Sequence, residues 1–122
     1  MILVLGEIKM ENSILNDVKK LLGILPDYTE FDQDIIIDIN SVFNILYQLG
    51  VGPAGFSISD SSTTWSTYIG DSTQLNMVKT YIYLKVRLMF DPPPSSALTS
   101  SIEKQIAELE WRLNVQVDPE ME

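Results

Sequence analysis

Carboxylates are the most numerous groups in this sequence that could do chemistry. Asp27, Glu30, Asp32, Asp34 and Asp38 crowd one stretch, and clustered carboxylates are the ligands that calcium prefers. Their spacing lacks the glycine turn and the closing glutamate of a calcium loop, and most of them fall on a predicted helix. Acids are stabilised near a helix start by the helix dipole. We therefore predict a solvated helix start here and no metal site.

Nucleophiles and general bases are poorly represented. The chain contains neither histidine nor cysteine, which removes the commonest general base, the commonest zinc ligand and the thiolate nucleophile. The serines of residues 57–62 therefore have no base to activate them. Tyr81, Tyr83 and Lys85 lack an accompanying dinucleotide fingerprint, and the glycines of 50–55 lack the strand and lysine of a phosphate loop. We predict no catalytic residue, no cofactor and no enzymatic activity.

Residues 75–90 are the segment around which the predicted fold is organised. At about 100° per residue the apolar side chains of this helix fall into two stripes on nearly opposite sides, so it must be covered twice. The second cover is either another helix of the same bundle or a neighbouring copy. The first stripe contains Leu75, Val78, Ile82, Val86 and Met89, and the second contains Met77, Tyr81, Leu84 and Leu88.

The other predicted helices each begin at a serine or threonine that can cap a helix. The caps and helices are Ser13 for a helix to Leu22, Thr29 with Asp32 for a long helix to about Leu49, Thr63 or Thr64 for a turn holding Trp65, and Ser95 or Ser96 for a helix to Arg112 or Asn114. Residues 50–62 are rich in glycine and serine and predict a loop, with a short strand around 56–58 as one option. Gly23 is the expected helix terminator.

This pattern predicts an all-α fold, a small bundle of about four helices with a glycine- and serine-rich loop and extended N- and C-terminal arms. We place the N-terminal arm at residues 1–12, the helical domain at 13–114 and the C-terminal tail at 115–122. The 122 residues suffice for one domain. No apolar run is long enough to cross a bilayer, and the apolar residues 1–10 lack the basic start of a secretion signal.

The net charge of -9 disfavours binding to nucleic acid and to anionic membranes. It suits either simple solubility or a surface past which DNA slides without sticking.

Several apolar residues fall where a solitary molecule would not place them. Ile37 lies on the polar side of its predicted helix, and Trp111 lies almost opposite the core stripe of the last helix. Trp111 is either an anchor for a partner or a contact of the turn that holds Trp65. Val115 and Val117 alternate with polar residues, so the tail either adds to a partner as a strand or is frayed. The candidate interface residues are Ile37, Trp65, Met77, Tyr81, Leu84, Leu88, Trp111, Val115 and Val117.

Five segments follow one another in an order that is typical of a known family. They are a helix ending in LLGI, then DQDIIIDINSVFNILYQLGVGP, a loop with STTW, VKTYIYLKVRLMFDPPPS, and finally QIAELEWRLNVQV. Together they resemble the head–tail connector proteins of tailed bacteriophages over most of residues 13–118. FDPP followed by ELEWRLN is the most specific part, and residues 1–9 have no counterpart.

The resemblance implies a structural subunit of the virion neck that is assembled in the host cytoplasm. Such a subunit belongs to a ring, typically dodecameric, between the portal protein and a stopper or tail-completion protein. The ring extends the channel through which double-stranded DNA passes without specific binding. The resemblance implies no membrane partner. We expect Asp60 and Asp71 to line that channel. The alternative is a monomeric helical protein-binding module, a regulator or chaperone, with both stripes covered internally.

Overall fold

The computed structural model describes residues 12–117, in which helices are joined by turns and loops. Its helices are α2 (Ile14–Leu21), α3 (Asp32–Gln48), α4 (Trp65–Ile69), α5 (Leu75–Phe90) and α6 (Ser96–Val117). No strand occurs within these residues, although Ser13 and Thr64 form an isolated antiparallel bridge. The predicted all-α class is therefore confirmed. The N-terminal arm, predicted at 1–12, lies outside the described residues except for Asn12.

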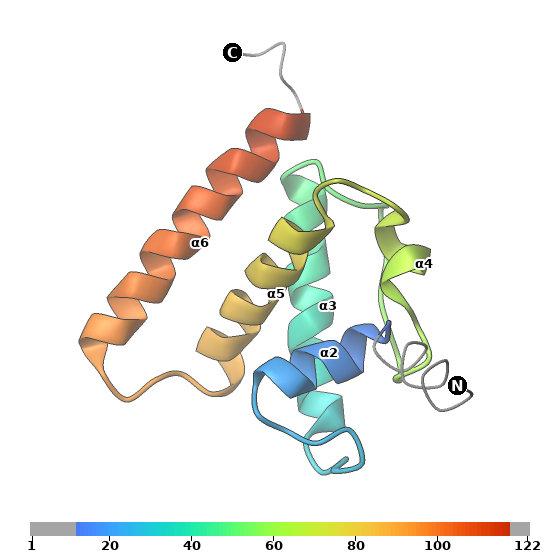
Figure 1. Ribbon diagram of the computed structural model, residues 1–122, viewed down its shortest axis with the longest axis vertical. Helices are drawn as coiled ribbons and strands as arrows, with labels where there is room; N and C mark the ends of the chain where they lie inside the picture. The colour runs from blue at the N-terminus through green and yellow to red at the C-terminus, as the bar shows by residue number, and fades with distance from the viewer. Residues whose placement is uncertain (1–11, 118–122) are drawn as a thin grey trace, which may run out of the picture.

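Helix α5 lies at the centre of the bundle, between α3 and α6 (Figure 1). Helix α2 packs against the lower parts of α3 and α5, and α4 lies on the side remote from α6 (Figure 1). In the first stripe of α5, Val78, Ile82 and Val86 are fully buried. In the second stripe, Tyr81 and Leu84 are also buried. Helices of the same protomer therefore cover most of both stripes, and Met89 of the first stripe is the member that stays exposed.

Three of the four predicted helix caps are confirmed. The side-chain oxygens of Ser13, Thr64 and Ser95 accept hydrogen bonds from the backbone N–H groups of the residue three positions later. The prediction for Thr29 is wrong. Helix α3 begins at Asp32, preceded by Phe31, and has no side-chain cap.

A buried lysine explains why Asp32 does not serve as the reciprocal acid of a cap. Lys19 is completely buried, and its Nζ lies 2.7 Å from Oδ1 of Asp32. The same Nζ donates hydrogen bonds to the carbonyl oxygens of Pro26 at 3.0 Å and Tyr28 at 2.8 Å. Lys19 therefore ties α2 to the segment that leads into α3. The contact with Asp32 is an ion pair that is completely buried on the side of Lys19.

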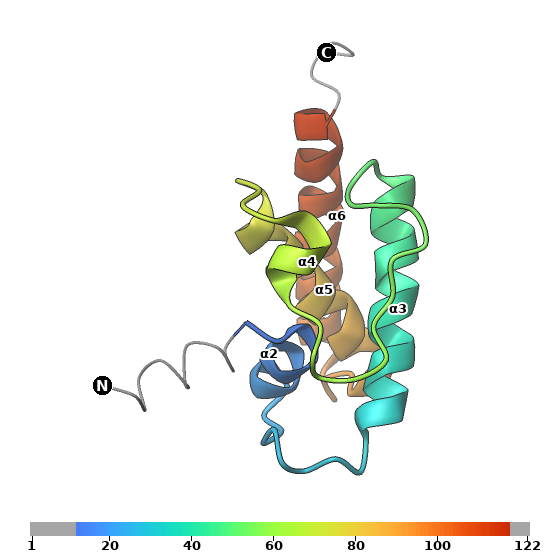
Figure 2. The same cartoon turned by 90° about the vertical axis from the view of Figure 1, so that its right-hand side faces the viewer.

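The loop between α3 and α4 runs back along α3 and forms no strand (Figure 2). Instead, the side chain of Asn40 pairs with the backbone of Ile58. Its Oδ1 accepts from the Ile58 N–H at 2.8 Å, and its Nδ2 donates to the Ile58 carbonyl at 3.0 Å. Phe43, Phe56 and Tyr68 then pack together with ring centroids 4.6–5.1 Å apart. The optional strand at 56–58 is thus replaced by an amide clamp that satisfies the same backbone groups.

Helix α6 continues to Val117, three residues beyond the predicted end at Asn114. The prediction that Val115 and Val117 begin an extended segment is therefore wrong. Asn114 lies within the helix, and its Nδ2 donates to the carbonyl of Leu49 at 3.3 Å. The first proline that could end α6 is Pro119. Residues 118–122 of the predicted tail lie outside the described part.

Candidate partner-binding surfaces

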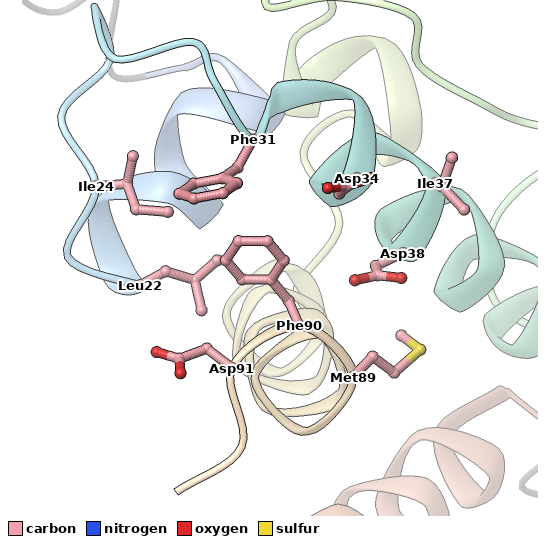
Figure 3. Close-up of a pocket in the computed structure, with 9 residues that line it drawn as sticks. All are labelled: Leu22, Ile24, Phe31, Asp34, Ile37, Asp38, Met89, Phe90 and Asp91. Atoms are coloured by element: carbon pink, nitrogen blue, oxygen red, sulfur yellow. The ribbon is translucent and has the colours of Figure 1, made fainter.

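A groove of about 700 Å³ lies where the end of α2, the start of α3 and the end of α5 meet. Figure 3 shows the side chains that line it. We call it the acidic groove. It is lined by Leu22, Ile24, Phe31, Asp34, Ile37, Asp38, Met89, Phe90 and Asp91.

The floor of the acidic groove is apolar. The rings of Phe31 and Phe90 point toward one another, edge to face, with centroids 5.4 Å apart (Figure 3). Ile37 is 62% exposed and Met89 is 44% exposed. Met89 was expected in the first apolar stripe of its helix, and its exposure corrects that prediction. Asp91 and the prolines after it end α5 here, so no further turn covers Met89.

The rim of the groove is acidic. Asp34, Asp38 and Asp91 line it, and none of its lining residues is a lysine or arginine. Burial raises the pKa of Asp38, and the negative charge of Asp34 raises it further. A positive charge placed here would oppose this rise in pKa, because it stabilises the carboxylate form. The groove therefore suits a protein segment that carries apolar and basic side chains together.

Among residues 12–117, no group of three or more His, Cys, Asp or Glu side chains is placed to hold a metal ion.

A second exposed surface lies on α6 and contains Trp111. We call it the outer face of α6 and define it by the exposed residues Ser100, Lys104, Ala107 and Trp111. Trp111 is 66% exposed. Trp65 is buried instead and donates from Nε1 to Oδ2 of Asp17 at 2.7 Å. Trp111 therefore does not pack on the turn that holds Trp65.

Eight of the nine predicted interface residues divide into three groups, and the side chain of Val117 lies outside the described part. Ile37 and Trp111 are exposed and available to a partner, while Met77, Leu88 and Val115 are half-buried against their own protomer. Trp65, Tyr81 and Leu84 lie in the core, so their assignment to an interface is wrong in this structure. Tyr81 and Leu84 are buried because other helices of the same protomer, α3, α6 and α2, pack around α5.

The structure adds groove residues that sequence reasoning did not assign to an interface. They are Phe31, Asp34, Asp38, Met89 and Asp91. Ile37 was the available signal, since it was an isoleucine on a polar helix side next to a run of acids. Its apolar companions come from another helix, and no pattern along the chain places Met89 beside it.

The predicted channel acids, Asp60 and Asp71, are both exposed and lie before and after α4. The hydroxyl of Ser62 and then its backbone N–H donate to Asp60, and these bonds lower the pKa of its carboxyl. Asp60 thus remains charged at neutral pH. That either residue lines a channel stays a prediction.

Over residues 12–117, no helix combines the length and the apolar character that a membrane span requires.

A comparison with protein families gave one match. The family model described as phage connector protein matches residues 14–120 of the chain. No curated protein and no solved structure matched the chain.

Proposed function

Since the chain belongs to the phage connector protein family, we propose that it is a subunit of a ring in the phage neck. The ring would lie between the portal protein and a stopper or tail-completion protein and extend the DNA channel. The observation that carries this proposal is the family match over 14–120, which includes every helix from α2 to α6. The same membership indicates a structural role for the protein rather than an enzymatic one.

A ring subunit needs two different surfaces, one for each neighbour, because head-to-tail contacts are heterologous. The acidic groove and the outer face of α6 meet this requirement. The groove offers exposed Ile37 between Asp34 and Asp38, and the α6 face offers Trp111 and Lys104. The charges and apolar groups of the two surfaces are complementary. Tryptophan is also enriched among residues that dominate interface energies. These features support a contact between the two surfaces in neighbouring copies.

The channel part of the proposal depends on charge. In this chain 17 acidic residues outnumber 8 lysines and arginines, and the resulting net charge of -9 disfavours binding to DNA phosphates. Exposed acids such as Asp60 and Asp71 would let DNA pass without binding. A channel wall dominated by lysine and arginine would contradict this part of the proposal.

A monomeric binding module is the second candidate, and the burial of Tyr81 and Leu84 inside one protomer favours it. Electron cryomicroscopy of the phage particle that contains this protein distinguishes the two. Ring density at the neck that fits helices α2–α6 would support the connector. A neck that lacks this protein, or holds a single copy, would overturn it.

A matched pair of variants tests the proposed ring contact in the same particle. Trp111→Glu places a charge on the outer face of α6 and should leave filled heads without attached tails. Glu103→Gln, at another exposed position of α6, should assemble normally. Normal particles with Trp111→Glu would exclude the outer face of α6 as the ring contact.

A further inference from the structure

The outward side of α2 carries an exposed apolar surface that the described residues leave open. Leu21 is 53% exposed and Leu25 is 70% exposed. Two hollows flank them, one of about 440 Å³ reaching Gly23 and Pro26, and one of about 230 Å³ reaching Trp65 and Lys79. Asp17 and Lys20 line both hollows. We call this surface the α2 face.

The described chain begins at the edge of the α2 face. The carbonyl oxygen of Asn12 accepts a hydrogen bond from the backbone N–H of Trp65 at 3.1 Å. Ser13 forms its bridge with Thr64, the residue just before Trp65. Because Trp65 lines the smaller hollow, residues 1–11 join the described chain beside that hollow.

Residues 1–11 have apolar and charged side chains that match those of this surface. They include seven apolar side chains, which are Met1, Ile2, Leu3, Val4, Leu5, Ile8 and Met10. Charged Glu7, Lys9 and Glu11 alternate with Ile8 and Met10, so an extended chain would turn these two apolar residues to one side. That period suits binding to a half-apolar, half-charged surface.

The length of the segment is also sufficient. The helix α2 has 8 residues, which corresponds to a length of about 12 Å. The four residues from Ile8 to Asn12 span about 14 Å when extended. Ile8 can therefore reach Leu21, and residues 1–5 can reach Leu25. Tethering to Asn12 also gives the segment a high effective concentration at its own α2 face.

We propose that residues 1–11 bind to the α2 face of the same molecule. This inference goes beyond the connector role, because the family match begins only at residue 14. It assigns to this chain an additional apolar contact that covers Leu21 and Leu25. The exposed Lys20 would face the acids of the segment, whereas Asp17 and Lys79 already pair with each other at 3.6 Å.

Disulfide trapping in the full chain tests the proposal directly, because the protein contains no cysteine of its own. Leu5→Cys with Leu25→Cys should give an intramolecular disulfide under mild oxidation, identified by peptide mass. Leu5→Cys with Leu98→Cys, an exposed leucine on α6, is the control and should not. A disulfide between two molecules, equal trapping in both pairs, or no disulfide in either pair would overturn the proposal.

Limited trypsin digestion gives a second readout that needs no cysteine. Cleavage after Lys9 should become about tenfold faster in Leu25→Asp than in the unaltered chain, because the segment would be released. Leu98→Asp is the control and should leave that rate unchanged. Equal cleavage rates in all three proteins would overturn the proposal. Unfolding curves would verify that both variants remain folded.

Discussion

The phenolic hydroxyl of Tyr81 donates a hydrogen bond of 2.7 Å to Oε2 of Glu110, and this bond joins α5 to α6. Tyr81 is completely buried, and a buried phenol normally requires such a partner. Burial raises the pKa of Tyr81, and the hydrogen bond and negative charge of Glu110 raise it further. The second stripe of α5 is therefore covered by α6 with its polar end satisfied.

We expect Tyr81→Phe to destabilise the protein by about 1 kcal/mol, the typical net contribution of one hydrogen bond. The ring would still fill its place, and Glu110 is partly exposed and can be hydrated. Urea unfolding measures the difference. Glu110→Gln in both backgrounds completes a double-mutant cycle. A Tyr81→Phe protein as stable as the unaltered chain would show that this bond adds nothing to the attachment of α6.

The hydroxyl of Tyr68 differs from that of Tyr81, because it is buried without a hydrogen-bond partner. Tyr68→Phe should therefore stabilise the protein at neutral pH by about 0.5–1 kcal/mol, since an unpaired polar group is costly to bury. Thermal or urea unfolding at pH 7 checks this. A loss of stability would indicate that the hydroxyl has a partner, such as a bound water.

Tyr68 also makes the free energy of unfolding depend on pH in the alkaline range. Burial raises the pKa of Tyr68 to about 12, whereas an unfolded tyrosine titrates near 10. The folded state favours the neutral phenol. The stability that this preference contributes is complete below pH 10 and is lost as the pH rises toward 12. The loss is on the order of 2 kcal/mol. The advantage of Tyr68→Phe should widen over this range, and a constant difference would contradict the assignment.

Gly52 is required by its backbone and by the ring of Tyr68. Its φ is +83°, and a Cβ at this position would lie 2.7 Å from the Tyr68 ring. We expect Gly52→Ala to cost about 2–4 kcal/mol, the sum of left-handed strain and overpacking. Gly55→Ala is the matched control, because its φ is +70° but no atom lies within 4 Å. It should cost about 1–2 kcal/mol. Equal losses in the two variants, measured by urea unfolding, would exclude the steric part.

Periodicity and capping chemistry predicted most of this fold. The stripes of α5, the caps at Ser13, Thr64 and Ser95, and the terminator Gly23 all depend on neighbours along the chain, and the structure contains them. The prediction for Thr29 failed because Lys19, which is distant in the sequence, binds Asp32. A capping pattern contains no information about such a tertiary partner.

The candidate surface was less predictable than the fold. Trp111 and Ile37 were recognised because each is a single apolar residue on a polar helix side. The acidic groove joins side chains of α3 and α5, and only the packing of these helices brings Met89 next to Asp38 (Figure 3). Tyr81 and Leu84 were assigned to an interface because an apolar stripe on a helix shows that something packs on it. The stripe does not show whether that is a helix of the same protomer or a neighbouring copy.

Replacement of the buried lysine should be among the most destabilising changes. Lys19→Met would leave Asp32 without its counter-ion and the carbonyls of Pro26 and Tyr28 without their donor. Removing one partner of a buried ion pair costs about 3–5 kcal/mol, and partial exposure of Asp32 places the expected loss near the lower end, at about 3 kcal/mol. Lys20→Met, at the exposed neighbouring position, should change stability by less than about 0.5 kcal/mol. Similar losses in both variants would contradict the role of Lys19.

The last prediction concerns the charge of the acidic groove. Burial and the neighbouring Asp34 raise the pKa of Asp38, so the folded state favours its neutral form. The stability that this preference contributes is complete below the unfolded pKa and is lost as the pH rises through the folded pKa. Asp38→Asn should therefore stabilise the isolated protein at pH 7, with a difference that shrinks when both proteins are unfolded in urea near pH 3. If a basic segment of a neighbour binds in the groove, the same variant should weaken assembly in the particle. The partner's positive charge would then lack the negative charge of Asp38. A variant that is more stable alone and assembles equally well would show that the groove does not contact a basic partner.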